Sequence, residues 1–415
     1  MADEWRDCLW GDITTLEYGK GLRGYENGTG PYPVYGTNGP IGKHVVPLCN
    51  HPGVIIGRKG AYRGVHYSKK PFFVIDTAFY LEPKADIDLR WAYYELLTHD
   101  INGLDSGSAI PSTSRDAFYN LPVRLPPSPE QHAIARILGT LDDKIELNRQ
   151  MNKTLEAIAQ ALFKSWFVDF DPVRARMEGR QPYGMDAETA ALFPDSFEDS
   201  PFGKIPRNWS VKPLSDCVSY LSRGVAPSYV QTSPIRALNQ KAIRWWHIDD
   251  EALKFHNSAK LVRKEAYIRK GDVVINSTGD ITIGRAYWFY HDIVNLFADS
   301  HVSIIRLLPD VLLPEVVVFQ IETPRHQDLI YGHVTGSTGQ LELNRSNLAH
   351  IPFLCPPIRL QWRFSEMVRP LFYLIWHDKE QSHILTTIRD TLLPKLLSGE
   401  MRVKDAEKFV EARAS

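Results

Sequence analysis

The chain has 415 residues, of which 43% are hydrophobic and 23% charged, and its formal net charge is -1. This length fits two globular domains with connecting elements. The near-neutral charge argues mildly against a simple nucleic-acid-binding protein, because such proteins are usually basic.

Cysteine usage and hydropathy exclude several further classes. The four cysteines, Cys8, Cys49, Cys217 and Cys355, lie far apart and form no CxxC pair, zinc-binding spacing or disulfide framework. This pattern fits a reducing, cytoplasmic setting. The acidic N-terminal segment lacks the apolar stretch of a signal peptide, and no run approaches the ~18 apolar residues of a membrane span. We therefore expect neither a metal site nor a membrane partner.

The first globular region, expected over residues 1–128, concentrates positive charge. Residues 18–70 hold eight lysines and arginines against one acid, Glu26. The eight are Lys20, Arg23, Lys43, Arg58, Lys59, Arg63, Lys69 and Lys70. Residues 35–39 form a glycine-flanked polar turn, and 57–63 follow a strand-like apolar run. Arginine pairs with guanine and asparagine with adenine, while glycine-rich turns suit phosphates. Each motif by itself is common turn chemistry.

A first long helix is expected over residues 129–168. Ser128 can cap this helix, and Gln131 completes a capping box. Apolar residues then recur at steps of four and three, with a polar interruption at Asn148 and Asn152. The pattern indicates a heptad seam with a polar middle.

An acidic linker, residues 169–205, leads to a second globular region at 206–356. The linker has eight acids against four bases, whereas residues 222–290 hold eleven lysines and arginines against six acids. Polar groups that suit base edges recur there. They are Asn239, Gln240 and Lys241, and, after another apolar strand, Asn276, Ser277, Thr278 and Asp280. One basic patch is usually a solvated face, but a patch in each region favours DNA.

A second long helix, residues 357–400, repeats the seam, and a C-terminal tail follows at 401–415. Pro370 and Pro394 are expected to kink or end this helix locally. Antiparallel pairing of the two helices would bring their polar middles together and fix the register. The seam residues are Leu138, Leu141, Ile145, Asn148, Asn152, Leu155 and Leu162 in the first helix, and Leu371, Ile375, Asp378, Ser382, Leu385 and Leu392 in the second. The alternative is that each stripe packs on the core of its own domain.

The chain repeats itself at an offset of 230 residues, so that the two halves share one architecture. Matching positions include Arg115 with Arg345, Gln131 with Gln361, Leu155 with Leu385 and Leu162 with Leu392. We therefore predict an α+β fold with an internal two-fold pseudo-repeat. Two globular α/β domains would be held apart by two long antiparallel coiled-coil helices.

The length of the seam suggests a molecular ruler. Residues 134–166 would span roughly 48 Å at about 1.5 Å per residue. That distance corresponds to about 14 base pairs of B-DNA. Domains at the ends of such a rod would touch DNA at separated patches.

Sequence signatures of catalysis are missing from the chain. There is no Walker A phosphate loop and no HExxH motif. The Pro-Pro pairs lack the context of an adenine methyltransferase loop. Pro194-Asp195 has no nearby partner of the kind that a restriction nuclease needs, and the fourteen histidines show no triad or metal spacing.

Four segments resemble the specificity subunits of type I restriction-modification enzymes. They are LFKSWF at 162–167, DFDP at 169–172, FGKIPRNW at 202–209 and LPKLLSGE at 393–400. The resemblance covers nearly the whole chain. It implies two target recognition domains, each reading one half of an asymmetric bipartite DNA site, with the helices setting the gap.

The resemblance also implies partners that carry the chemistry. Two methyltransferase subunits would bind S-adenosylmethionine, and restriction subunits would use ATP and Mg to translocate and cleave DNA. This chain itself would hold no cofactor and would not be an enzyme.

By this resemblance, contact residues lie in matching loops of the two domains. In the first domain they are Tyr35, Thr37, Asn38, Arg58, Lys59, Tyr62, Arg63, Ser106 and Ser108, and the basic stretch adds Lys20 and Arg23. In the second they are Asn239, Gln240, Lys241, Asn276, Ser277, Thr278, Asp280, Ser337, Thr338 and Gln340. The second domain departs from the first in the sequence of this loop, which is Asn-Ser-Thr-Gly at residues 276–279 where the first domain has Gly-Arg-Lys-Gly at 57–60. The competing hypotheses are a helical adaptor that only docks partner proteins, and an enzyme in its own right.

Overall fold

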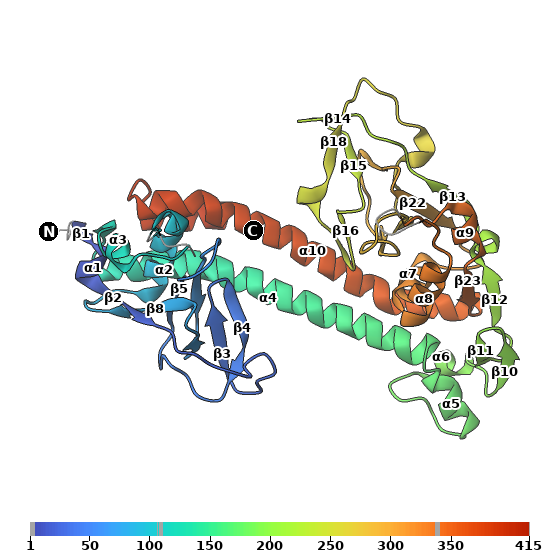
Figure 1. Ribbon diagram of the computed structural model, residues 1–415. Helices are drawn as coiled ribbons and strands as arrows, with labels where there is room; N and C mark the ends of the chain where they lie inside the picture. Colours follow the sequence, from blue (N-terminus) through green and yellow to red (C-terminus); the bar gives the residue numbers. More distant parts are fainter. Residues whose placement is uncertain (1–4, 106, 108–110, 337–340, 415) are drawn as a thin grey trace. The chain divides into compact units, whose positions relative to one another are not determined.

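The computed structural model describes residues 5–105, 107, 111–336 and 341–414 (Figure 1). The chain divides into two compact units. The first comprises Met1–Arg149 and Lys379–Ser415, and the second Gln150–Asp378. Two long helices, α4 (Ser128–Phe167) and α10 (Ile358–Leu397), each contribute residues to both units.

The first unit is built around a four-stranded antiparallel sheet. Its strand order is β2 (Thr14–Tyr18), β8 (Ala78–Pro83), β5 (Gly53–Gly57) and β6 (Val65–Ser68). A second sheet has the order β4 (Gly39–His44), β3 (Tyr32–Gly36) and β7 (Phe73–Val74), and β1 (Arg6–Leu9) pairs with β9 (Pro122–Leu125). The helices of this unit besides α4 and α10 are α1 (Trp10–Ile13), α2 (Leu89–Leu97), the 3-10 turn η1 (Ile101–Gly103), α3 (Arg115–Tyr119) and α11 (Val403–Ala414).

Strand β5 is apolar along its whole length because both of its faces are buried. Val54 and Ile56 pack into the larger core of the first unit, while Ile55 packs into a small second core with Tyr35 and Phe72. A strand covered on both sides reads as a continuous apolar run instead of an alternating one.

The second unit repeats this plan. Its main antiparallel sheet has the order β13 (Val218–Arg223), β22 (Val302–Leu307), β19 (Val273–Asn276) and β20 (Ala286–Trp288). A second sheet has the order β14 (Tyr229–Val230), β18 (Lys254–His256), β15 (Arg236–Leu238) and β21 (Leu296–Ala298), and β12 (Ser210–Pro213) pairs with β23 (Pro352–Cys355).

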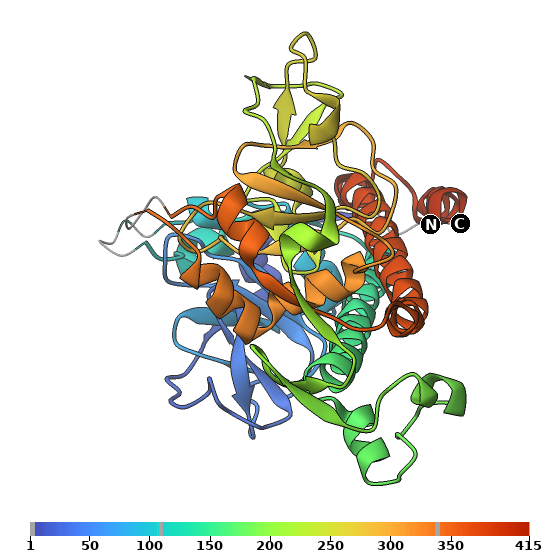
Figure 2. The same ribbon diagram turned by 90° about the vertical axis from the view of Figure 1, so that its right-hand side faces the viewer.

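Shorter elements complete the second unit. The two short hairpins are β10 (Phe197–Ser200) with β11 (Gly203–Pro206), and β16 (Ile243–Arg244) with β17 (His247–Ile248). The α-helices are α5 (Asp171–Met177), α6 (Ala187–Ala191), α7 (Pro314–Glu322), α8 (Pro324–Gly332) and α9 (Arg345–His350). The 3-10 turns are η2 (Leu214–Cys217), η3 (Asp250–Ala252) and η4 (Lys264–Ala266). Figure 2 gives a second view of the same elements.

The predicted pseudo-repeat is therefore visible in the strand order. In each main sheet, the strand that comes first in the chain pairs with the strand that comes last, and this last strand also pairs with a buried central strand. The pairings are β2 with β8 and β8 with β5 in the first unit, and β13 with β22 and β22 with β19 in the second. Each unit also has one parallel strand pair in its second sheet, β3 with β7 and β15 with β21. The predicted fold class, α+β with two similar domains and two long helices, is confirmed.

Within the first unit, α4 and α10 run antiparallel and share their seam with the domain core. Leu138 and Leu141 of α4 and Leu385 and Leu392 of α10 lie in one cluster with Trp91. Ile145 packs against the same cluster. The seam therefore pairs the two helices and also packs on the core of its own domain, because the helix pair forms one wall of that core.

Polar contacts interrupt the seam in the first unit. Asn148 Nδ2 donates to Gln381 Oε1 at 2.9 Å and to Ser382 Oγ at 3.2 Å. Arg389, which stands at a seam position, reaches Asp142 at 2.8 Å. These directional contacts favour one register over neighbouring ones.

Within the second unit, the other halves of the two helices pack in the same way. The seam residues Leu155 and Ile375 are buried in the core of this unit, and Leu162 and Leu371 pack against it at its edge. Asn152 is also buried. Asp378 lies half-buried on α10.

Three expectations about chain segments can be compared with the structure. Of the kink or end expected at Pro370 and Pro394, an end does not occur, because α10 continues to Leu397 and its buried apolar stripe outweighs the lost backbone hydrogen bonds. Residues 401–415 were expected as a tail, but Val403–Ala414 form α11, whose Phe409 packs against the first core. The acidic linker is structured as α5, α6 and the β10–β11 hairpin.

Candidate nucleic-acid interface

In each unit two loops meet beyond the end of the buried central strand. In the first unit the backbone N–H of Thr113 donates to Arg58 O at 2.9 Å, and that of Gly60 donates to Pro111 O at 3.0 Å. The predicted contact segment 57–63 is thereby joined to the chain that leads into α3.

The second unit builds the same junction. Leu343 N–H donates to Ser277 O at 2.8 Å, and Gly279 N–H donates to Leu341 O at 3.3 Å. Gly60 and Gly279 have φ of +117° and +93°, a region that favours glycine, so the turn chemistry recurs where the flanking sequences differ. The matched hydrogen bonds identify these loops as equivalent parts of the repeat.

Several predicted contact residues of the first unit are exposed. Lys20, Arg23 and Asn38 are exposed, and the Tyr62 side chain is 79% exposed. Lys59 lies 3.5 Å from Asp76 and is half-exposed. These residues offer cationic, amide and aromatic groups to a ligand.

Arg58 is positioned by its neighbours. Its guanidinium lies 4.8 Å from the centre of the Tyr18 ring and donates to Asp76 O at 3.0 Å. Stacking on an aromatic ring orients a guanidinium without neutralising its charge.

Other predicted contact residues of the first unit support the loops from inside. Arg63 is only 3% exposed and donates to Gly60 O at 3.0 Å and to Asn102 O at 2.6 Å. Tyr35 is buried, and burial raises the pKa of its hydroxyl. Thr37 O accepts a hydrogen bond from Gly64 N–H. Arg63 and Thr37 hold the turn 57–64 in place, and Tyr35 packs in the small core with Ile55.

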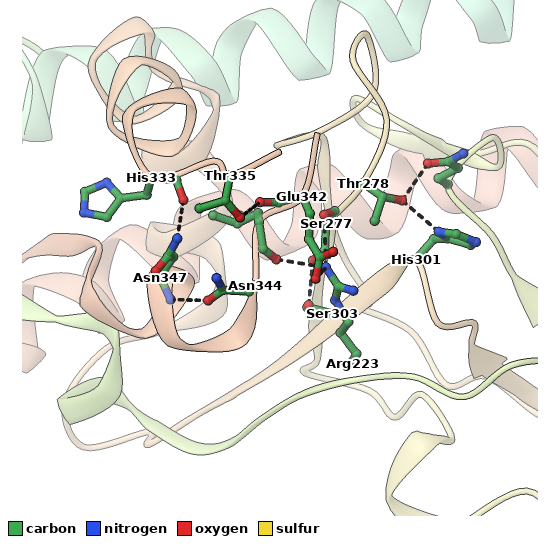
Figure 3. A network of polar contacts seen from close by, with 12 residues as sticks. Arg223, Ser277, Thr278, His301, Ser303, His333, Thr335, Glu342, Asn344 and Asn347 are labelled. Atoms are coloured by element: carbon green, nitrogen blue, oxygen red, sulfur yellow. Dashed lines mark hydrogen bonds and ion pairs between the residues drawn. The ribbon is translucent and has the colours of Figure 1, made fainter. Parts of the chain in front are cut away.

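The second unit surrounds its loop junction with a polar network (Figure 3). Arg223, at the end of β13, donates to Ser277 O at 3.3 Å and to Leu343 O at 3.2 Å, and pairs with Glu342 at 3.0 Å. Thr335 and Glu342 exchange backbone hydrogen bonds of 2.9 and 2.8 Å. Arg223 therefore fastens the base of the loop that these two residues close.

A second part of the network fixes the strand end itself. Ser277 Oγ lies 2.6 Å from Ser303 Oγ, and Thr278 Oγ1 lies 2.9 Å from His301 Nδ1. Thr278 also donates to Gln240 Oε1 at 3.0 Å. Figure 3 shows these side chains gathered around the junction.

The predicted contact residues of the second unit also divide by exposure. Asn276 is buried and donates to Gln240 O at 2.9 Å, and Asn239 is buried and donates to Ala252 O at 2.6 Å. Lys241 and Asp280 are exposed. Ser106, Ser108, Ser337, Thr338 and Gln340 lie outside the described residues.

Sequence reasoning missed the residues that clamp the loop bases. Arg223, Glu342 and Asn102 were not singled out. One of them, Glu342, could have been found from the repeat, because the offset of 230 residues aligns it with Ser112. Ser112 forms an isolated β-bridge with Lys59, and Glu342 forms one with Thr278.

Among the described residues, no helix is long and apolar enough to cross a membrane.

Comparison with known proteins agrees with this architecture. Residues 3–157 match the family described as type I restriction modification DNA specificity domain. The chain is 27% identical to the HindI specificity subunit of Haemophilus influenzae, with 79% of this chain and 81% of the relative covered. It is 26% identical to the MjaIX specificity subunit of Methanocaldococcus jannaschii, with 78% and 71% covered.

A solved structure shares the fold. The type I restriction-modification S subunit from M. genitalium superposes with a TM-score of 0.65 at 16% identity, over 95% of this chain and 96% of that one. The resemblance expected from the sequence motifs is confirmed: the chain is similar over most of its length to specificity subunits of type I restriction enzymes.

Proposed function

We propose that the chain is the DNA sequence-recognition subunit of a type I restriction-modification complex. Each unit would read one half of a bipartite, asymmetric site. The observation that carries this proposal is the matched loop junction, in which Thr113 with Arg58 and Leu343 with Ser277 make equivalent backbone hydrogen bonds. Two equivalent junctions with different side chains suit a protein that reads two different half-sites.

The exposed residues at these junctions would make the contacts. Lys20 and Arg23 would bind phosphates, and Asn38, Arg58, Lys59 and Tyr62 would reach bases or phosphates. In the second unit Lys241, Thr278 and Asp280 are the described candidates, and Ser106, Ser108, Ser337, Thr338 and Gln340, which lie outside the described residues, remain candidates. The buried members, Tyr35, Arg63, Asn239, Asn276 and Ser277, would act by shaping the loops.

The chemistry would lie in partner subunits. Methyltransferase subunits with S-adenosylmethionine would modify the site, and ATP- and Mg-dependent restriction subunits would translocate and cleave DNA, in the cytoplasm. In this account the chain is non-catalytic. Exposed apolar side chains on α10 would suit protein partners, because Met367 and Leu374, which are 47% and 53% exposed, are seven residues apart and share a helix face.

The paired helices would set the gap between the half-sites. In the first unit the register of the helix pair depends on Asn148 with Ser382 and on Arg389 with Asp142. Inserting one heptad into both helices should lengthen the unspecified gap without altering either half-site. A change in the bases that are read would contradict this role.

The direct test is DNA protection by the complex reconstituted with its methyltransferase subunit. We expect a split site to be protected, with an affinity that falls steeply as salt rises. Equal affinity for all duplexes would overturn the proposal. If Arg58→Ala and Lys59→Ala left DNA binding intact, a helical adaptor would become the better account.

A further inference from the structure

A cysteine, a histidine and a glutamate converge in the first unit, apart from the loop junction. Cys49 Sγ lies 3.5 Å from His51 Nε2 and 3.9 Å from Glu82 Oε1, and His51 Nε2 lies 3.1 Å from Glu82 Oε2. Cys49 and His51 follow strand β4, and Glu82 stands on β8, 31 residues beyond His51. Among the described residues, this is the group of three whose ligand atoms gather within 4.8 Å.

These separations fit a common central ion. A tetrahedral zinc with bonds of about 2.3 Å to sulfur and about 2.0–2.2 Å to nitrogen and oxygen holds its ligand atoms about 3.4–3.6 Å apart. The 3.5 Å between Cys49 Sγ and His51 Nε2 lies within that range. The two oxygens of Glu82 lie one beside each of these atoms, Oε2 at 3.1 Å from Nε2 and Oε1 at 3.9 Å from Sγ. A rotation of the carboxylate would be needed to bring a single oxygen into the coordination sphere of both.

The tautomer of His51 favours a cation at the same place. Its Nδ1 lies 2.7 Å from Pro52 O, which requires the ring proton to sit on Nδ1. The lone pair of a neutral ring then projects from Nε2 toward the Glu82 carboxylate, which is itself an acceptor. A backbone carbonyl that holds the far nitrogen of a histidine is the usual orienting contact of a metal ligand.

We propose that Cys49, His51 and Glu82 bind one zinc ion, with the fourth position open to water. Thiolate and imidazole select zinc over magnesium or calcium, and a carboxylate oxygen is the third type of protein ligand that zinc accepts. The His51 and Glu82 side chains are 41% and 37% exposed, so an ion can enter from solvent. On binding, the Cys49 thiol would release its proton to solvent and coordinate as thiolate.

The site would cross-link the two layers of the first unit. Cys49 exchanges backbone hydrogen bonds with Phe72 and packs in the small core beside Tyr35. Glu82 belongs to the main sheet, where it pairs with Thr15. A bound ion would thus fasten the β3–β4 hairpin to the main sheet, and this hairpin carries Thr37 and Asn38 at its turn. The cysteine spacing did not predict the site, because its third ligand comes from a distant strand.

The test measures metal binding by the untagged full-length chain. Dialysed protein is loaded with Zn²⁺, and in a parallel sample with Co²⁺, and bound metal is counted by mass spectrometry. We expect one ion per chain, a sulfur-to-cobalt charge-transfer band, and a higher thermal midpoint with Zn²⁺. His51→Gln and Glu82→Gln should each weaken binding at least tenfold, and Cys49→Ser should remove the charge-transfer band.

Matched controls separate this site from adventitious binding. Cys8→Ser changes another cysteine of the first unit, and His99→Gln changes another histidine. Both should retain the wild-type stoichiometry and cobalt band. His51 and Glu82 are half-exposed, so their variants should fold, as circular dichroism can verify. Less than one ion per ten wild-type chains, or equal binding by all variants, would overturn the site and leave His51 and Glu82 as an ion pair. Neither result bears on DNA recognition.

Discussion

Gln131 and Gln361 make the same two hydrogen bonds in the two halves of the chain. Gln131 Nε2 donates to Pro126 O at 2.8 Å, and Gln361 Nε2 donates to Pro356 O at 2.7 Å. Their Oε1 atoms each accept at 2.9 Å, from Asp88 N–H and Leu313 N–H, respectively. Asp88 and Leu313 are the N-cap residues of α2 and α7. Each glutamine therefore ties the start of a long helix to the start of a domain helix.

Replacement of this buried amide should destabilise its own unit. Gln361 is fully buried, so Gln361→Leu leaves the Leu313 N–H and the Pro356 carbonyl without partners. We expect a loss of about 2–4 kcal/mol in the free energy of unfolding of the second unit. Urea denaturation followed by fluorescence measures the change. Gln231→Leu, at an exposed position of the same unit, should alter it by less than about 0.5 kcal/mol. Equal stability of the two variants would contradict this role.

Loss of the Arg223 clamp should impair one half-site only. Arg223→Met removes the guanidinium that holds Ser277 O, Leu343 O and Glu342 together. We expect tenfold or greater weakening of binding to DNA that carries the correct second half-site, with discrimination at the first half-site unchanged. Competition binding with duplexes mutated in either half measures both effects. Lys264→Met, on the exposed η4 turn, is the control and should bind like the wild type. Equal losses at both halves would argue against a local clamp.

Lys20 and Arg23 should act through charge instead of sequence. Both are exposed at the basic surface of the first unit, and we expect Lys20→Ala and Arg23→Ala to weaken binding to all duplexes alike. Each change should lower the slope of log affinity against log salt by about 1. Asn38→Ala is the matched comparison, because it should alter base preference and leave the salt slope unchanged. A base-specific effect of Lys20→Ala would contradict the assignment.

His326 should make the second unit sensitive to acid. It is 3% exposed between Phe202 and Phe353, and burial lowers its pKa to about 4. The unfolded chain binds a proton near pH 6.5, whereas the folded chain resists it until about 4. Stability from this group is therefore complete above pH 6.5 and is lost as pH falls toward 4, by up to about 3 kcal/mol.

The measurement is the thermal midpoint of the second unit between pH 7 and pH 4.5. His326→Gln should flatten its decline, because glutamine takes up no proton. His377→Gln, at an exposed position on α10, should keep the wild-type slope. An unchanged slope in His326→Gln would show that other groups control the acid response.

Periodic features of the fold were predictable from sequence, because they repeat a physical pattern. The heptad steps placed Leu138 and Leu392 in a common seam, and the apolar run at 54–56 became strand β5. Helix α4 begins at Ser128, next to its predicted start, but the predicted capping box does not form, because the Gln131 side chain bonds Asp88 N–H and Pro126 O instead. The periodic pattern is thus readable from the sequence, whereas the use of Gln131 depends on a tertiary contact.

Features that depend on burial or on distant partners were not predictable. Arg63 and Asn276 looked like DNA-reading groups by residue type, yet tertiary packing turns them inward as supports. Arg223 gave no local signal, because its partners come from separate segments. Helix α11 was read as a tail, because its amphipathic stripe is short and its docking surface is formed by the remote first core.

The central claim is that the two units read two half-sites independently. The most direct measurement maps methylated bases genome-wide with the cognate methyltransferase present, for the wild-type chain and for the double variant Lys59→Ala with Tyr62→Ala. We predict a bipartite methylated motif in which the variant relaxes or shifts bases of one half, while the other half and the gap stay unchanged. A motif altered in both halves, or an identical motif in both proteins, would contradict the account.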